Sequence, residues 1–107
     1  IGIRTWDIDE ETSPFAFPLL LENTKFSRKH LADHLQRDNI ETRVLFGGNL
    51  MLHPSYNKKA HLWESFGEHD NANNIAENFI MLGVSQVNDT SKIEKVIGSL
   101  DSFFKKW

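Results

Sequence analysis

The sequence contains no cysteine among its 107 residues. This absence excludes a disulfide framework, a thiolate metal ligand and a cysteine nucleophile within the chain. Long hydrophobic runs are also missing, since no apolar stretch approaches the roughly 18 residues that a membrane-spanning helix needs. The first residues, Ile1 to Asp7, lack the basic-then-apolar plan of a secretory signal. We therefore expect a cytoplasmic location and no membrane partner.

An excess of positive charge is missing as well. The chain has 12 Lys and Arg against 15 Asp and Glu, which gives a formal net charge of −3. Basic residues are scattered, and only Lys58-Lys59 and Lys105-Lys106 are adjacent. A nucleic-acid-binding domain normally carries a basic face. The charge pattern therefore favours no nucleic-acid partner.

Size and composition are those of an ordinary globular domain. The hydrophobic fraction is 39% and the charged fraction 25%. A chain of this length buries roughly two-thirds of its unfolded surface, enough for one core. Neither an internal repeat nor a linker divides it, so we expect one domain over residues 1–107. The chain begins with Ile1 and not Met, and we expect it to be a piece of a longer protein.

Hydrophobic periodicity and turn residues predict three strands and three helices. In chain order these are strand 15–22, helix 27–39, strand 40–46, short helix 71–78, strand 79–84 and helix 91–106. This order predicts an α/β fold of the small α+β kind, in which a three-stranded, mainly antiparallel sheet is packed with helices. Pro18 cannot donate a ladder hydrogen bond, so it predicts a sheet edge or a bulge.

Capping residues fix the expected helix starts. Ser27 is a good N-cap for the first long helix, and Phe26 and Leu31 occupy the positions of a hydrophobic staple. Asp70 is the expected cap of the short helix. Ser91 and Glu94 fit a capping box for the last helix. Its expected core-facing stripe is Ile93, Val96, Ile97, Leu100, Phe103, Phe104 and Trp107.

Two histidines on the first long helix raise the question of a metal site. His30 and His34 are spaced i, i+4, as two zinc ligands on one helix would be. The glutamate that follows the first histidine of a metalloprotease helix is replaced by Leu31. We interpret the pair as part of a solvated helix flank and predict no metal site.

A pair of glycines follows the second predicted strand. Gly47-Gly48 comes directly after the apolar run that ends at Phe46, and Asn49 and His53 follow. Two glycines at the end of an apolar strand are costly unless the backbone needs them there. A tight turn and a ligand-binding loop both satisfy this pattern, and no phosphate-cradling helix motif follows it.

Four segments of the chain together resemble the C-terminal part of the DegT/StrS-type pyridoxal-phosphate enzymes. "FAFPLLLEN" resembles the first strand of that family's small domain, and "FSRKHLADHLQRDNIETRVLFGGNLMLHPSY" resembles its helix, its "IETR" strand and its ligand-side loop. "NFIMLGVSQ" resembles the late strand and "SKIEKVIGSLDSFF" the closing helix. The most specific part is the "IETR…GGNL…HP" block.

This resemblance implies the activity of a parent enzyme. Family members are nucleotide-sugar aminotransferases and 3-dehydratases that act on 4-keto sugars, in lipopolysaccharide and other surface-polysaccharide or deoxysugar biosynthesis. Phe46-Gly47-Gly48-Asn49 is more similar to the dehydratases, whereas Val44 and Ser85-Gln86 depart from them. Transfer of an amino group and removal of the C3 hydroxyl both remain open.

The resemblance also implies what this chain lacks. The family's pyridoxal phosphate is held by a preceding large domain, and no residue here matches its Schiff-base lysine or the histidine that replaces it. The chain alone is therefore expected to be inactive, to contain no catalytic residue and to bind no cofactor covalently. The parent enzyme is expected to be a homodimer. The alternative is a non-catalytic α/β binding or interaction module.

Six residues are the expected substrate-binding set: Arg43, Phe46, Gly47, Gly48, Asn49 and His53. The glycines would let the backbone approach a nucleotide sugar without interference from a Cβ atom. Asn49 offers a donor and an acceptor to sugar hydroxyls, and Arg43 offers a cation to a phosphate. On this interpretation Asn49→Ala would weaken substrate binding and hardly change stability.

Overall fold

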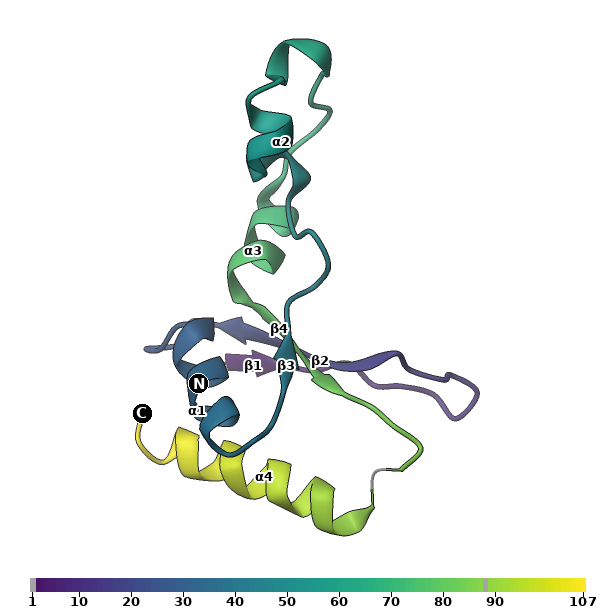
Figure 1. The fold of residues 1–107 in the computed structure, drawn as a ribbon, viewed down its shortest axis with the longest axis vertical. Coiled ribbons are helices and arrows are strands. Elements are labelled where there is room, and N and C mark those ends of the chain that lie inside the picture. The colour runs from purple at the N-terminus through teal and green to yellow at the C-terminus, as the bar shows by residue number, and fades with distance from the viewer. Residues whose placement is uncertain (1, 88) are drawn as a thin grey trace.

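The computed structural model describes residues 2–87 and 89–107, and it has an antiparallel sheet at its centre. The sheet has four strands in the order β1-β2-β4-β3 (Figure 1). Their bounds are Gly2–Arg4 for β1, Ala16–Glu22 for β2, Thr42–Arg43 for β3 and Phe79–Gly83 for β4. The predicted α+β fold is confirmed, with four strands and not the three expected.

The additional strand lies in the segment that precedes the first predicted strand. β1 pairs antiparallel with the end of β2, with Gly2 opposite Glu22 and Arg4 opposite Leu20. An ion pair of 2.7 Å joins Arg4 to Glu22, and Ile3 packs against the core. A three-residue strand is too short to show alternation, so it is not recognisable as a periodic pattern.

The strand expected over 40–46 is much shorter in the structure. Its ladder covers only Thr42 and Arg43, which lie opposite Leu82 and Met81 of β4. Positive φ values of 40° at Phe46 and 60° at Gly48 turn the chain away from an extended path. Pro18 pairs with Met81 on one side, and β1 reaches only as far as Leu20, so Pro18 faces a local sheet edge as expected.

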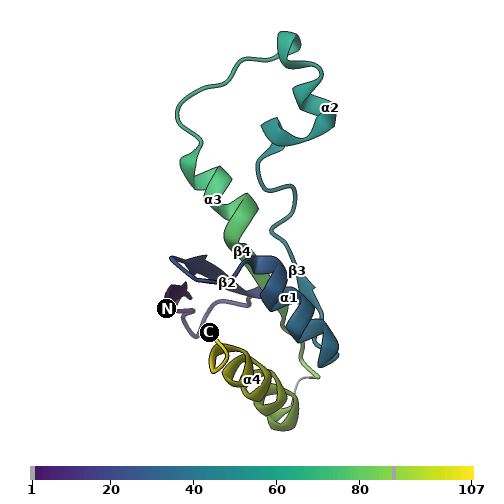
Figure 2. The same ribbon diagram turned by 90° about the vertical axis from the view of Figure 1, so that its left-hand side faces the viewer.

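Two helices cover one face of the sheet (Figure 2). They are α1, Arg28–Arg37, and α4, Thr90–Phe104. Between them and the sheet lies the main core: Leu19, Leu21, Phe26, Leu31, Leu35, Ile40, Ile80, Leu82 and Phe103. Leu31 and Leu35 are completely buried, which confirms the predicted inner face of the first long helix.

The helix caps differ in part from the expected ones. Ser27 caps α1 as predicted. In the reciprocal bond of the capping box, the Ser27 N–H donates to His30 Nδ1. The N-cap of α4 is Asp89 and not Ser91, because the Asp89 carboxylate accepts a 3.0 Å bond from the Lys92 N–H. An ionised carboxylate at a helix N-terminus is a stronger acceptor than a hydroxyl.

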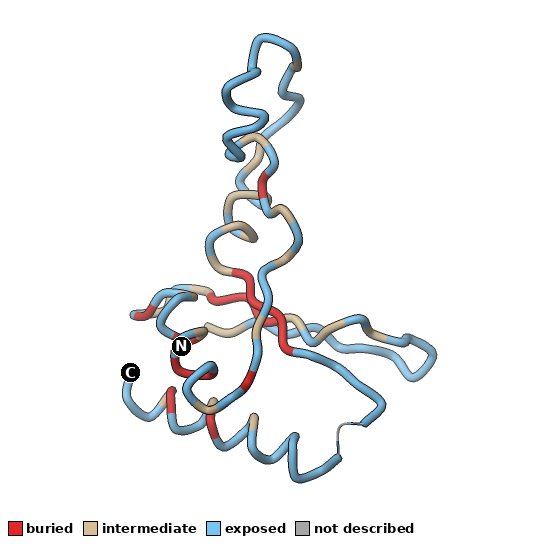
Figure 3. The backbone as a smooth tube through the Cα atoms, viewed as in Figure 1, coloured by how far each residue is buried: buried red, intermediate tan, exposed pale blue. Residues whose placement is uncertain are grey.

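The predicted core stripe of α4 is correct only in part. Trp107, beyond the end of α4, is 44% exposed and contacts Phe26 with its ring. Phe103 is buried, and Val96, Leu100 and Phe104 pack against the core. Ile93 and Ile97 are more than half exposed. The first turns of α4 extend past the sheet, as the pale-blue tube of that region shows (Figure 3), so these side chains have nothing to pack on.

His34 corrects the prediction of a solvated helix flank. Its side chain is buried between α1 and α4, with Nε2 3.0 Å from the Ser99 carbonyl oxygen. Since a carbonyl only accepts, Nε2 carries the proton and donates it. The ring also packs against Phe103, at 5.1 Å between centroids. The contact between α1 and α4 thus includes a buried hydrogen bond, which the helical periodicity of the sequence does not reveal.

Residues 44–78, which we call the arm, project from the sheet between β3 and β4 (Figure 1). The arm contains short helical turns at Leu50–Leu52, at Pro54–Asn57 (α2) and at Ala60–Leu62, followed by α3 over Asp70–Asn78. His69, and not Asp70, is the N-cap position of α3. The radius of gyration is 16.3 Å, against about 13 Å for a compact chain of this length.

The base of the arm is fixed to the sheet by a second apolar cluster. Leu20, Phe79 and Met81 form it, and Leu45 and Ile75 of the arm pack against it. The Arg28 guanidinium donates a 2.7 Å bond to the Ala76 carbonyl oxygen, which ties the start of α1 to α3. The last turns of α3 therefore have a fixed place relative to the sheet.

Candidate functional site

The six predicted site residues lie in one loop at the base of the arm. This loop, residues 43–53, leads from β3 into the first helical turns, and we call it the glycine loop. It packs on α3, which the sequence pattern did not place beside it.

Gly48 meets a requirement that is internal to the fold. Its φ is +60°, and its N–H donates a 2.9 Å bond to the Leu45 carbonyl oxygen. A Cβ atom at Gly48 would lie 3.0 Å from the Ala76 Cβ and 3.2 Å from the Ala76 Cα. The second glycine is therefore needed both for its backbone conformation and for its approach to α3.

Gly47 is less constrained and is held by His53. The Gly47 carbonyl oxygen accepts a hydrogen bond from His53 Nε2. A Cβ atom at Gly47 would meet the end of the flexible Leu50 side chain at 2.9 Å. The bond to His53 closes the glycine loop across six residues, so it fixes where the loop backbone points.

Asn49 is buried, and its side chain is used inside the protein. Its Nδ2 donates a 2.7 Å bond to Asn73 Oδ1 of α3, and its Oδ1 accepts a 3.0 Å bond from the Met51 N–H. These bonds cap the turn Leu50–Leu52 and tie it to α3. The expectation that Asn49→Ala hardly changes stability is not compatible with this geometry.

Arg43 and Phe46 are exposed and carry large side chains, whereas Gly48 and His53 are exposed residues engaged in contacts within the loop. The Arg43 guanidinium lies 2.5 Å from Glu41, and both side chains are about three-quarters exposed. Phe46 is 78% exposed, and its ring stacks on that of Phe15, with 6.3 Å between centroids. Arg43 and Phe46 can therefore reach a bound molecule without a rearrangement of the core.

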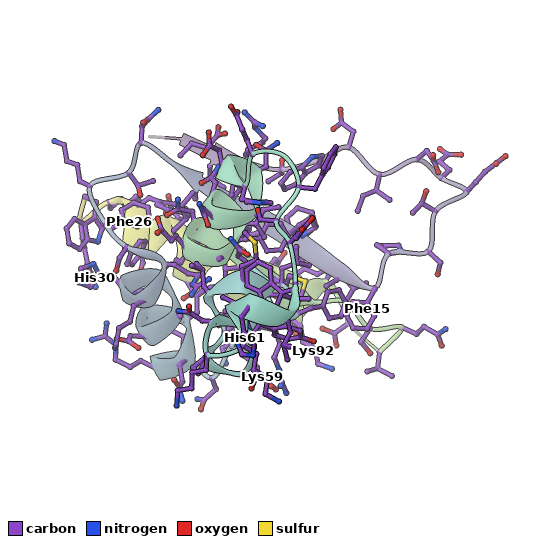
Figure 4. All side chains as sticks on the ribbon, turned by 90° about the horizontal axis from the view of Figure 1, so that it is seen from above. Phe15, Phe26, His30, Lys59, His61 and Lys92 are labelled. Carbon is purple, nitrogen blue, oxygen red and sulfur yellow. The ribbon has the colours of Figure 1, made fainter. Side chains whose placement is uncertain are left out.

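The structure adds three residues to the predicted site: Phe15, Asn73 and Ala76. Asn73 belongs to the run "EHDNANN" at 68–74, which has the composition of a loop. From Asp70 onward this run is the first part of α3. Phe15 follows the turn residues Thr12-Ser13-Pro14 and begins the predicted strand 15–22. Its aromatic side chain at a strand end was the only sequence feature that could have indicated a surface role. Figure 4 shows Phe15 on the opposite side of the molecule from Phe26 and His30.

The hollows that the structure describes do not lie at the glycine loop. A shallow hollow of about 370 Å³ is lined by Gln36, Asn39, Ile40, Glu41 and Thr42, and none of the six predicted residues lines it. In residues 2–87 and 89–107, no three potential metal-ligating side chains cluster, and no helix has the length and apolarity to span a membrane.

The carboxyl groups with shifted pKa lie elsewhere and have structural causes. The hydroxyl of Ser99, followed by the charge of His34, lowers the pKa of Asp38 at the α1–α4 contact. The hydroxyl of Thr12 lowers the pKa of Asp9, and the N–H of Lys92 lowers that of Asp89. Each shift favours the charged form, so none of these groups is prepared for proton transfer near neutral pH.

Comparisons with known proteins assign the chain to a family and a fold. A profile of the DegT/DnrJ/EryC1/StrS aminotransferase family matches residues 3–101. No curated protein sequence matches the chain significantly. Two solved structures have a similar fold, and both are GDP-4-keto-6-deoxymannose 3-dehydratases.

The first of these is the E. coli enzyme with bound hydrated PLP. It has a TM-score of 0.75 and 21% sequence identity over 92% of this chain. The second holds a trapped PLP-glutamate geminal diamine, with a TM-score of 0.64 and 20% identity over 89% of this chain. The chain spans 25% of the length of each.

Proposed function

Because the chain belongs to the DegT/DnrJ/EryC1/StrS aminotransferase family, we propose that it is the small domain of a pyridoxal-phosphate enzyme acting on a nucleotide-linked 4-keto sugar. The observation that carries the proposal is the family match over residues 3–101. The fold of a 3-dehydratase over 92% of the chain favours removal of the C3 hydroxyl. The family description favours amination as the second candidate reaction.

None of the lysines of this chain is placed to form a Schiff base with pyridoxal phosphate. Schiff-base chemistry needs an amine that is desolvated or placed beside a further activating group. All eight lysines of the chain are exposed: Lys25, Lys29, Lys58, Lys59, Lys92, Lys95, Lys105 and Lys106. We assign the cofactor to a large domain of the parent protein and treat residues 1–107 as one small domain beside it.

Within this proposal the glycine loop binds substrate and takes no part in bond breaking. Arg43 supplies a cation to a phosphate oxygen once it leaves Glu41, and Phe46 offers an exposed ring beside the half-buried Gly47. Gly48, Asn49 and His53 hold that surface in shape through their contacts with α3 and Gly47. The loop is thereby pre-organised, which reduces the entropic cost of binding.

The wider setting is part of the same proposal. We place the parent enzyme in the cytoplasm, as a homodimer, in the synthesis of lipopolysaccharide or another deoxysugar-containing polymer. The alternative is a non-catalytic α/β interaction module with the same fold. The alternative predicts that the full-length protein neither binds the cofactor nor consumes a nucleotide sugar.

The test uses the full-length protein that contains this chain. Purified protein is mixed with pyridoxal phosphate, and its absorption spectrum is recorded. Glutamate, as the amino donor, and GDP-4-keto-6-deoxymannose are then added, and the consumption of the sugar is followed. We expect saturable cofactor absorption near 400 nm (about where such imines absorb) and loss of substrate. Cofactor binding without substrate loss would reject the substrate class, and the absence of both would favour the interaction module.

A further inference from the structure

Phe15 and Phe46 form an aromatic pair that the fold leaves on its surface. Phe15 precedes β2, and Phe46 follows β3. Their ring planes are inclined by only 21°, with 6.3 Å between centroids. Phe15 is 79% exposed and Phe46 is 78% exposed. Because both rings lie outside the two apolar clusters of this domain, burial in its core does not explain the pair.

The backbone at Phe46 is strained in support of this arrangement. Its φ of 40° lies in the left-handed region, which disfavours any residue with a Cβ atom. Gly47 is the next residue, and a glycine at the position of Phe46 would adopt a positive φ without that cost because it has no Cβ atom. Strain of this kind is retained where the surrounding structure fixes it, often at ligand sites.

The exposed aromatic side chains elsewhere in the described residues differ from this pair. Trp107 stacks on His30 at 26°, but its ring also packs against Phe26 of the core. Phe66, between the turn Ala60–Leu62 and α3, is 97% exposed, and no ring of the described residues pairs with it. Trp6 is inclined by 45° to the buried Phe79, so its ring contacts the core and is not part of a parallel exposed pair. Only Phe15 and Phe46 present two nearly parallel, exposed ring faces beside the glycine loop.

We propose that Phe15 and Phe46 form a stacking surface for the base of the nucleotide. The proposal rests on the proposed function, because it names how that substrate is held. A base offers a flat π-face, and its stacking on an aromatic side chain is a recurrent source of affinity. The phosphates beyond the base would meet the Arg43 guanidinium and the Gly47 N–H, which lie in the same loop.

The test measures binding of GDP and of inorganic pyrophosphate to the full-length protein by calorimetry. Phe15→Leu and Phe46→Leu keep apolar volume and remove the ring faces. We expect each to raise the Kd of GDP about tenfold and to leave the Kd of pyrophosphate within twofold. Phe46→Tyr keeps the ring and should retain GDP binding. Phe66→Leu is the matched control and should leave both values unchanged.

Two results would overturn the proposal. One is an unchanged Kd of GDP in both leucine variants, which would make the pair a contact with another part of the protein. The other is an equal loss of GDP and pyrophosphate affinity, which would show a general distortion of the loop. If either result is found while the full-length protein still consumes the sugar, the stacking surface is rejected and the proposed function stands. A base-dependent loss without any substrate consumption would support the stacking surface and reject the reaction.

Discussion

At the scale of single residues, the glycine loop separates side chains that shape it from side chains that face outward. Gly48, Asn49 and His53 make contacts inside the protein, whereas Arg43 and Phe46 are largely exposed. In the sequence, residues of both groups are of types that occur in binding loops. Their roles differ because α3 lies under the loop, and this packing depends on contacts between residues far apart in the chain.

Asn49→Ala should destabilise the fold. The change removes the bonds to Asn73 Oδ1 and to the Met51 N–H from a buried position. Two such bonds are worth about 2 kcal/mol together. Urea unfolding should show that loss, and Asn57→Ala, at an exposed position of α2, should stay within about 0.5 kcal/mol of wild type. Equal stability of the two variants would contradict the internal role of Asn49.

Two glycine-to-alanine changes should have opposite signs. Gly48→Ala introduces a Cβ atom at φ +60° and 3.0 Å from Ala76, so it should cost at least about 1 kcal/mol. Gly98→Ala lies inside α4 with no atom within 4 Å of the new Cβ, so helix propensity should add about 0.5–1 kcal/mol of stability. Thermal melting of both variants measures the signs directly. A stabilised Gly48→Ala would refute the tight packing of the loop on α3.

At the scale of elements, capping residues and hydrophobic periodicity predicted correctly those features that depend on contacts between residues close together in the sequence. Ser27 begins α1, and Leu31 and Leu35 form its inner face, because cap and stripe are both encoded within a few turns. The predictions failed where the sheet ends. Ile93 and Ile97 continue the stripe of α4 past the last strand, and β1 is too short for a periodic pattern.

The contact between α1 and α4 makes a pH-dependent contribution to stability. Ser99 Oγ donates a hydrogen bond to Asp38 Oδ2 across this contact, and it lowers the pKa of Asp38 below its unfolded value. A lowered folded-state pKa stabilises the fold above the unfolded value, near pH 4, and the contribution is lost as the pH falls through the folded pKa.

Ser99→Ala should therefore reduce the acid sensitivity of the fold. The stability difference between wild type and Ser99→Ala should be full at pH 6 and should shrink as the pH is lowered from about 5 to 3. Ser102→Ala, on the same helix, has no hydrogen bond to Asp38 and should keep the wild-type pH profile. Unfolding free energies measured across this range provide the test. A difference that is constant with pH would show that Asp38 is not linked through Ser99.

At the scale of the whole molecule, the sheet with its two helices is one body, and the arm extends from it with little burial of its own (Figure 3). The order of the long elements and the α+β class were predictable from periodicity. The pairing of Asn49 with Asn73 and of Phe46 with Phe15 was not, since each joins segments more than 20 residues apart. Nothing in the local sequence records such contacts.

The glycine loop as a substrate-binding surface is the central claim, and the kinetics of Arg43→Ala in the full-length enzyme test it most directly. Loss of a charged contact to phosphate should raise KM about tenfold, with kcat and the cofactor absorption unchanged. Arg37→Ala removes the same charge from an exposed position of α1 and should leave KM within twofold. An unchanged KM in Arg43→Ala would contradict the claim.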